Sequence, residues 1–255
     1  MSTILEDQRI AADIVTNVLL ELQRMTQPEA SLDMLDRLAE CMIREAGGEP
    51  YNKGYKPDWA PEPYPATICA NVDYEICHAP PASRILKEGS IVTYDVGVKY
   101  KSGCGDAALA VPVGIISNRK KRALRYGLQA LYEGIKIVRA DVPISMIGAA
   151  ISQYAGRNGF RIIKEFGGHT IGSEMHEDPK IPNFYNKDDE HVLLQEGAVI
   201  CIEPMITSGN GIMKIAPDGW TAYCPDGQPV VMFEHQILVT KNGSEILTKH
   251  ILFSI

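Results

Sequence analysis

The chain has 255 residues, of which 45% are hydrophobic and 22% charged, proportions typical of a globular protein rather than of a disordered one. Its formal net charge of -7 argues against nonspecific binding to nucleic acid or anionic lipid, which needs clustered Lys and Arg. The N-terminal segment is acidic where a signal peptide is basic, and no apolar run reaches the roughly 18 residues of a membrane span. We therefore expect a cytoplasmic protein.

Two amphipathic helices are expected at the start of the chain. Apolar residues recur at helical spacing over residues 4–24 and again over residues 31–46, where Ser31 is a suitable N-cap and Gly47 a stop. Residues 51–64 are crowded with Pro and Gly and predict a loop. A short strand region over residues 65–77 follows.

Residues 91–112 predict a β-hairpin that carries two carboxylates. Its strands are rich in Val, Ile, Tyr and Ala, and a Lys-Ser-Gly turn separates them. Pairing about a centre between Tyr100 and Lys101 would set Asp95 directly opposite Asp106, about 5 Å apart at Cβ. Two such carboxylates among apolar neighbours cannot both stay ionised, so a hard divalent metal ion between them is the simplest explanation.

Two alternatives remain open for this hairpin from its own residues. The aspartates could simply face water on an exposed hairpin. A bulge at Gly103 or Gly105 would also change the register.

The second half of the chain has a similar order of elements. Helices are expected over residues 118–138 and 145–157, and strands over residues 198–203 and 230–240. Two helices followed by strands therefore occur twice. The order predicts an α+β protein, mainly antiparallel, with two related halves and helices on one side of a curved sheet.

Three further polar residues in this half need an explanation. His169 follows two glycines that let the backbone approach a ligand closely, Glu203 ends the apolar run AVICIE, and Glu234 interrupts VVMFEHQILV. A lone His is often a satisfied core residue, and a Glu at a strand end is often solvated. An ionised carboxylate in the middle of a buried strand, however, requires a partner. If these three converge with the two aspartates, the set could hold two divalent ions and a water.

The chain resembles the methionine aminopeptidases of the bacterial type I class. The resemblance is carried by the spacing of the two aspartates, by GGHTIGSEMHEDP around His169, by IEPM at Glu203, and by DGWTAY followed by FEHQILVT around Glu234. It extends from the first helix to Thr240, and the interval from His169 to Glu203 is too short for the long insertion of the type II class. The resemblance implies one catalytic metallopeptidase domain over residues 1–255, with the pita-bread fold of two pseudo-symmetric halves around a curved antiparallel sheet.

The resemblance also assigns roles to individual residues. It implies metal ligands at Asp95, Asp106, His169, Glu203 and Glu234. Asp106 and Glu234 would bridge two divalent ions, which could be Mn, Fe or Co. Glu203 would serve as the base and proton shuttle, His78 would lie near the scissile amide, and His176 would steady the tetrahedral intermediate. The implied substrate-binding residues are Tyr64, Cys69, His78, Met175, His176 and Trp220.

The implied reaction is removal of the N-terminal methionine from nascent polypeptides. The partner is then the N-terminal peptide of a nascent chain, with the ribosome as a further candidate, and neither nucleic acid nor a membrane is expected. A deprotonated α-amine, with an ordinary pKa near ~7.7 to 8.0, can bind a metal and would restrict cleavage to the first residue. We expect a monomer.

Several positions depart from the family pattern, and they cluster around the substrate. The usual His-Gly-Ile-Pro is replaced by His78 followed by Ala79, Pro80 and Pro81, Thr170 stands for a usual Gly, and Met175 for a usual aromatic residue. The strictness of the methionine preference is therefore open. Two alternatives follow, an aminopeptidase of shifted specificity such as one acting on Xaa-Pro, and a non-catalytic binding member of the fold. The complete set of implied ligands disfavours the second.

Overall fold

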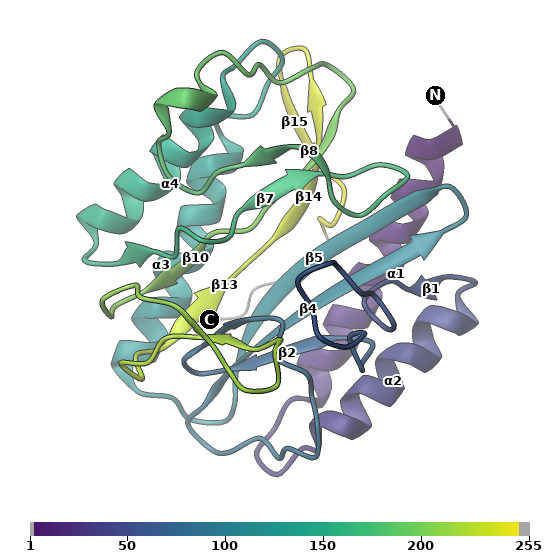
Figure 1. Ribbon diagram of the computed structural model, residues 1–255, viewed down its shortest axis with the longest axis vertical. Coiled ribbons are helices and arrows are strands. Elements are labelled where there is room, and N and C mark those ends of the chain that lie inside the picture. Colours follow the sequence, from purple (N-terminus) through teal and green to yellow (C-terminus); the bar gives the residue numbers. More distant parts are fainter. Residues whose placement is uncertain (1–2, 250–255) are drawn as a thin grey trace.

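The computed structural model describes residues 3–249 (Figure 1). Its α-helices are close to the expected ranges: α1 (Thr3–Met25), α2 (Leu32–Glu45), α3 (Asn118–Ile135) and α4 (Ile144–Arg157). Ser31 caps α2 as expected, because its hydroxyl accepts a hydrogen bond from the backbone N–H of Met34. The expected loop over residues 51–64 contains neither helix nor strand.

The first half is built on a long hairpin of β4 (Ile91–Tyr100) and β5 (Gly103–Pro112). Strands β1 (Glu49–Pro50) and β2 (Cys69–Val72) also pair with β4. Helix α1 packs across the hairpin, and α2 lies beside α1 (Figure 1).

The register of this hairpin differs from the one expected. Asp95 pairs with Ala108, and Asp106 pairs with Gly97, so the two aspartates are diagonal neighbours rather than direct partners. The reason is the turn, which consists of Lys101 and Ser102 only, with Lys101 in the left-handed region at φ 47°. Compared with the expected register, one strand is displaced by two residues along the other. Because side chains alternate between the two faces with a period of two residues, both carboxylates still lie on one face of the sheet.

Gly103 and Gly105 do not form the bulge considered above but lie where α1 approaches β5 closely. Pairing between β4 and β5 is continuous past both residues. A Cβ at Gly105 would lie 2.5 Å from the backbone carbon of Ala11, and one at Gly103 would lie 2.5 Å from the backbone nitrogen of Gln8. The glycines therefore allow the backbone of α1 to approach β5 closely.

Replacing Gly105 with alanine is expected to destabilise the protein by about 2 kcal/mol, because neither the helix nor the strand backbone can move away cheaply. Denaturant unfolding would measure this change. The matched control is Gly156→Ala on the exposed side of α4, where nothing lies within 4 Å of the added carbon. That control should be neutral or stabilising by up to about 1 kcal/mol. Equal stability of the two variants would contradict the close approach.

The second half carries a larger sheet in the order β15-β14-β9-β7-β8. Its strands are β7 (Gly168–Thr170), β8 (Glu177–Ile181), β9 (Val199–Ile202), β14 (His235–Thr240) and β15 (Gly243–Ile246). Two small sheets complete the fold in the orders β13-β10-β6 and β11-β12-β3. Their strands are β3 (Glu75–Cys77), β6 (Arg161–Ile162), β10 (Met205–Thr207), β11 (Lys214–Ile215), β12 (Ala222–Tyr223) and β13 (Val230–Met232), and η1 (Lys187–Asp189) is a short 3-10 helix.

The expected single strand over residues 230–240 is broken at Glu234. Strand β13 pairs with β10, whereas β14 pairs with β9 in a different sheet, and β15 follows as a further strand. The N–H of Glu234 donates to the carbonyl of Ala108 in β5. Glu234 therefore lies where the chain passes between sheets and joins the two halves, not on the regular face of one strand.

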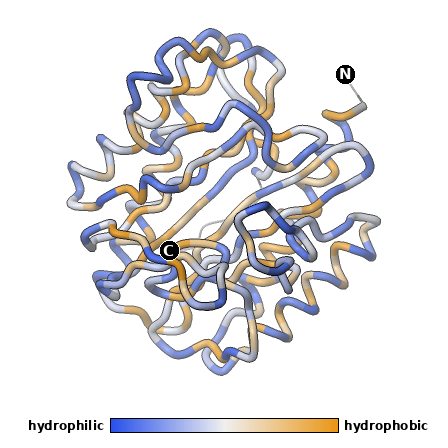
Figure 2. The backbone as a smooth tube through the Cα atoms, in the orientation of Figure 1, coloured by the Kyte–Doolittle hydropathy of each residue, from blue (hydrophilic) through white to orange (hydrophobic). Residues whose placement is uncertain are grey.

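The helix pair α3 and α4 belongs to this second half, as α1 and α2 belong to the first (Figure 1). Strands β13 and β14 are buried almost throughout, and Figure 2 shows hydrophobic and hydrophilic residues alternating along the helices. This repetition agrees with the α+β arrangement expected. No helix among residues 3–249 combines the length and the apolar character needed to cross a membrane.

Candidate metal centre and substrate cavity

A cluster of potential metal ligands lies where the two halves meet. Asp106 of β5, His169 of β7, Cys201 of β9 and Glu234 each offer one donor atom, and these atoms all lie within 4.8 Å of one another. All four residues are buried. A hairpin strand, two strands of the larger sheet and the break between sheets thus contribute one residue each.

The two remaining residues expected as ligands adjoin this cluster. The His169 Nε2 atom lies 3.6 Å from Asp106 Oδ2 and 3.9 Å from Glu203 Oε1. Asp95 lies diagonally across the hairpin from Asp106, and the two carboxyls interact electrostatically. The structure therefore brings together all five residues expected as ligands.

The electrostatics of this cluster call for a cation. Burial raises the pKa of Asp106 to about 7, and burial followed by repulsion from neighbouring carboxylates raises the pKa of Asp95, Glu203 and Glu234 well above the ordinary range. The buried Oδ1 of Asp106 and Oε1 of Glu234 have no hydrogen-bond partner. Unpartnered carboxylate oxygens of this kind fit divalent metal ions.

The imidazole of His169 is oriented for the same purpose. Its Nδ1 lies 3.1 Å from the carbonyl oxygen of Thr170, and since a carbonyl can only accept, Nδ1 is the protonated nitrogen. Burial lowers the pKa of His169 to about 4, so the ring is neutral near pH 7. Nε2 therefore presents a free lone pair to the carboxylates, as a metal-binding histidine requires.

Cys201 is a member of the cluster that the sequence reasoning did not single out. Its thiol is fully buried, and burial followed by the charge of Glu234 raises its pKa well above the ordinary value. The run AVICIE holds the only available signal, because Cys201 lies two residues before Glu203 in a strand.

A cavity of about 320 Å³ opens beside the cluster. All six residues expected to bind substrate line it: Tyr64, Cys69, His78, Met175, His176 and Trp220. Asp95 and Asp106 also reach its wall. The ring centroids of Tyr64 and Trp220 lie 5.0 Å apart in an edge-on arrangement. A mostly apolar, aromatic pocket adjoining the candidate metal ligands suits an apolar side chain.

Five more residues of this wall were not anticipated: Asn52, Tyr55, Trp59, Phe166 and Lys180. Three of them belong to the loop over residues 51–64, whose aromatic content was the available signal. Residue Trp59 is 60% exposed, and its ring lies 5.0 Å from the Trp220 ring and stacks on His78 at 6.2 Å. The loop therefore forms one wall of the cavity.

The two histidines expected in catalysis, His78 and His176, both line the cavity beside the cluster. The His176 and His169 ring centroids are 4.5 Å apart, and the His78 ring packs edge-on against Phe166 at 5.5 Å. Loss of solvation lowers the pKa of His78 and of His176 below the ordinary histidine value. Both rings are therefore neutral near pH 7 and can act as hydrogen-bond donors or acceptors.

A larger cavity of about 690 Å³ shares His78 and His176 with the smaller one, and its wall also includes His169 and Glu203. It extends past Lys164 and Phe184 toward Ile144 of α4. The candidate ligands thus lie between a smaller aromatic pocket and a roomier groove, which could hold the remainder of a peptide.

The residues that depart from the family pattern are either buried or hydrogen-bonded within the fold. Met175 is almost fully buried in the wall of the smaller cavity and keeps that wall apolar. The Thr170 hydroxyl donates to the carbonyl of Pro179 on the neighbouring strand. Ala79 is fully buried directly after His78.

Comparison with known proteins gives consistent results. The model of metallopeptidase family M24 matches residues 6–241. The chain is 36% identical to methionine aminopeptidase 1 of Bacillus subtilis over 94% of each chain, and 35% identical to a methionine aminopeptidase of Mycoplasma capricolum over 96% of this chain and 95% of the other. The structure resembles methionine aminopeptidase from Thermotoga maritima, with a TM-score of 0.92 and 32% identity over 98% of each chain. It also shares its fold with a Xaa-Pro dipeptidase from Bacillus anthracis, at a TM-score of 0.74, 22% identity, and coverage of 98% and 61%.

Proposed function

This chain belongs to metallopeptidase family M24 and is an aminopeptidase, and we propose that it removes methionine from the N-termini of newly made polypeptides. Its likeness to solved methionine aminopeptidases confirms the pita-bread fold expected from the sequence. The observation that carries the proposal is the buried set of carboxylates and His169 beside an aromatic cavity, whose wall includes Asp95 and Asp106. Nascent chains as substrates would place the reaction in the cytoplasm.

The residues that would hold two divalent ions are the five brought together between the halves: Asp95, Asp106, His169, Glu203 and Glu234. Mn, Fe and Co all suit this mixture of oxygen and nitrogen donors. When bound, such ions supply the Lewis-acid chemistry that activates a water molecule and polarises the scissile carbonyl.

The chain's own side chains would carry the proton and stabilise charge. Glu203 would take a proton from the attacking water and deliver it to the leaving amine, since burial and its neighbours give this carboxyl a high proton affinity. His176, neutral and open to both cavities, would donate a hydrogen bond to the developing oxyanion. His78, which lines the same two cavities, would contact the scissile amide.

The smaller cavity would hold the methionine side chain, and the larger cavity the residues that follow. Tyr64, Trp59 and Trp220 give the smaller pocket aromatic walls, while Met175 adds a flexible apolar surface. A single catalytic domain acting as a monomer on free N-terminal peptides, near the ribosome or away from it, is sufficient for this scheme.

The test is hydrolysis of Met-Ala-Ser beside Leu-Ala-Ser and Ala-Pro-Ser, by apo-protein reconstituted with Mn, Fe or Co. We expect kcat/KM for the methionine peptide to exceed that for the leucine peptide by about 10-fold or more, because a difference of side-chain shape in a pocket is worth about 1 to 3 kcal/mol. The chelated protein should be inactive. Preferential cleavage of Ala-Pro-Ser would instead favour an Xaa-Pro specificity, and no cleavage by folded, metal-loaded protein would favour a binding role.

A further inference from the structure

His78 is held in a backbone conformation that it would not adopt without support. It follows β3 directly and has a φ of 58°, in the left-handed region. A side chain with a Cβ persists there only where its surroundings fix it. The position of the imidazole in the cavity wall therefore depends on what holds the chain on either side of it.

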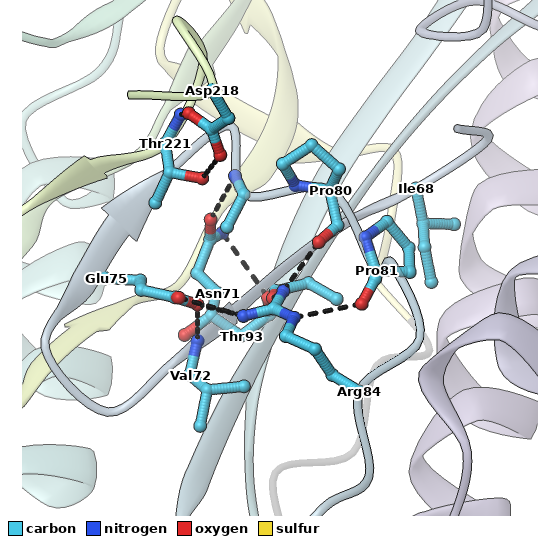
Figure 3. A network of polar contacts seen from close by, with 12 residues as sticks. Ile68, Asn71, Val72, Glu75, Pro80, Pro81, Arg84, Thr93, Asp218 and Thr221 are labelled. Carbon is cyan, nitrogen blue, oxygen red and sulfur yellow. Dashed lines mark hydrogen bonds and ion pairs between the residues drawn. The ribbon is translucent and has the colours of Figure 1, made fainter. Parts of the chain in front are cut away.

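Each backbone N–H and C=O group of residues 79–81 forms a hydrogen bond, and Figure 3 shows the bonds to Asn71 and Arg84. The N–H of Ala79 donates to Asn71 Oδ1 at 2.9 Å, and the carbonyl of Ala79 accepts from the N–H of Ala70 at 2.8 Å. Pro80 and Pro81 have no N–H, so only their carbonyls can be held. Both carbonyls accept from Arg84, at 2.7 and 2.9 Å respectively.

The guanidinium of Arg84 also reaches the chain before His78. Its Nη2 donates to the carbonyl of Ala70 at 2.7 Å, and its Nη1 lies 2.8 Å from both carboxylate oxygens of Glu75. The Glu75 carboxylate is itself fixed, since it accepts from the N–H of Val72 at 2.6 Å. All three nitrogens of Arg84 are therefore engaged, with acceptors on both sides of His78.

We propose that Arg84 is a positioning residue that holds His78 against the scissile amide. It acts by tying the segment of Ala79, Pro80 and Pro81 to β2 and β3. This role rests on the proposed function, because it assumes that His78 contacts the substrate. A guanidinium is needed at this position, because its three nitrogens donate in different directions to acceptors that surround one side chain.

The Arg84→Lys variant tests this role. Lysine keeps the charge and can still pair with Glu75, but its single nitrogen cannot reach the carbonyls of Ala70, Pro80 and Pro81 together. We expect kcat for Met-Ala-Ser to fall about 10-fold with KM within about twofold of wild type, because small misplacement of a catalytic group affects the transition state most. Metal content should not change.

A double variant separates positioning from general damage. In a His78→Ala background, Arg84→Lys should cause no further loss of kcat if it acts through His78. Losses that multiply would overturn the proposal. The control is Arg9→Lys, which removes a similar two-pronged pair with Glu245, at 2.7 Å for each contact, and should leave kcat unchanged.

A measurement without substrate distinguishes failure of this inference from failure of the proposed function. The ring-proton resonances of His78 in the NMR spectrum, assigned by their loss in His78→Ala, should carry ring-current shifts from Trp59, Trp220 and Phe166. Arg84→Lys should reduce these shifts even if no peptide is cleaved. Glu75→Gln, which leaves the guanidinium but weakens its anchor, should act in the same direction if Arg84→Lys does not fold. Unchanged His78 resonances in the folded variants would overturn the proposal.

Discussion

Replacing Glu203 with glutamine is expected to lower kcat for Met-Ala-Ser by about 10³-fold, because the attacking water loses its base. The amide oxygen can still serve as a ligand, and its size is nearly the same, so near-UV circular dichroism and metal content should stay close to wild type. Glu196→Gln on the exposed surface is the control and should keep full activity. Full activity of the Glu203 variant would remove this residue from the mechanism.

The same variant has a second expected effect, on the stability of the metal-free protein. Burial and the neighbouring carboxylates raise the folded-state pKa of Glu203 above its unfolded value. A carboxyl with a raised pKa contributes stability below its unfolded pKa, near ~4.3, and that contribution is lost as the pH rises through the folded pKa. Glutamine does not ionise, so the chelated variant should melt at a higher temperature than chelated wild type at pH 7.5.

The difference in melting temperature should shrink toward pH 4, where the wild-type carboxyl is protonated in the folded state and mostly protonated in the unfolded state. Calorimetric scans of both proteins in EDTA across this pH range would measure it. A variant that melts below wild type at pH 7.5 would show that the cluster is not a site of carboxylate repulsion.

Replacing His176 with alanine is expected to lower kcat by about 10²-fold to 10³-fold, because a preorganised donor to the oxyanion is lost. KM should change much less, since the hydrogen bond strengthens as charge develops in the transition state. The neutral imidazole of His176 has its donor available near pH 7, and this makes the expected loss independent of protonation there.

The His176 ring also contacts His169, with centroids 4.5 Å apart, so metal content must be measured beside the rate. Unchanged metal content with reduced kcat would support the oxyanion role, whereas parallel loss of both would show that His176 supports the metal ligand instead. His191→Ala, at an exposed position, is the control. An unchanged rate for His176→Ala would exclude the histidine from catalysis.

Two features beside the substrate cavity could not be predicted from the sequence: the contacts of Arg84, shown in Figure 3, and the position of Trp59. The departures at Ala79 and Pro80 fall in a segment whose geometry is set by Arg84, a residue with no distinguishing pattern in the sequence. Trp59 was hidden in a Pro-rich loop, and only the fold places it over Trp220 and His78. Loop residues of this kind escape prediction because no periodicity fixes where their side chains point.

The sequence by itself determined the helices and the long hairpin, and it singled out five polar residues whose convergence it gave only as a condition. Amphipathic spacing, an N-cap and apolar strands are local signals, and buried carboxylates among apolar neighbours demand partners wherever they lie. The two-residue turn at Lys101, the close approach of α1 at Gly105, and the break at Glu234 were decided by tertiary structure. Each depends on contacts between segments far apart in the chain, which no local pattern encodes.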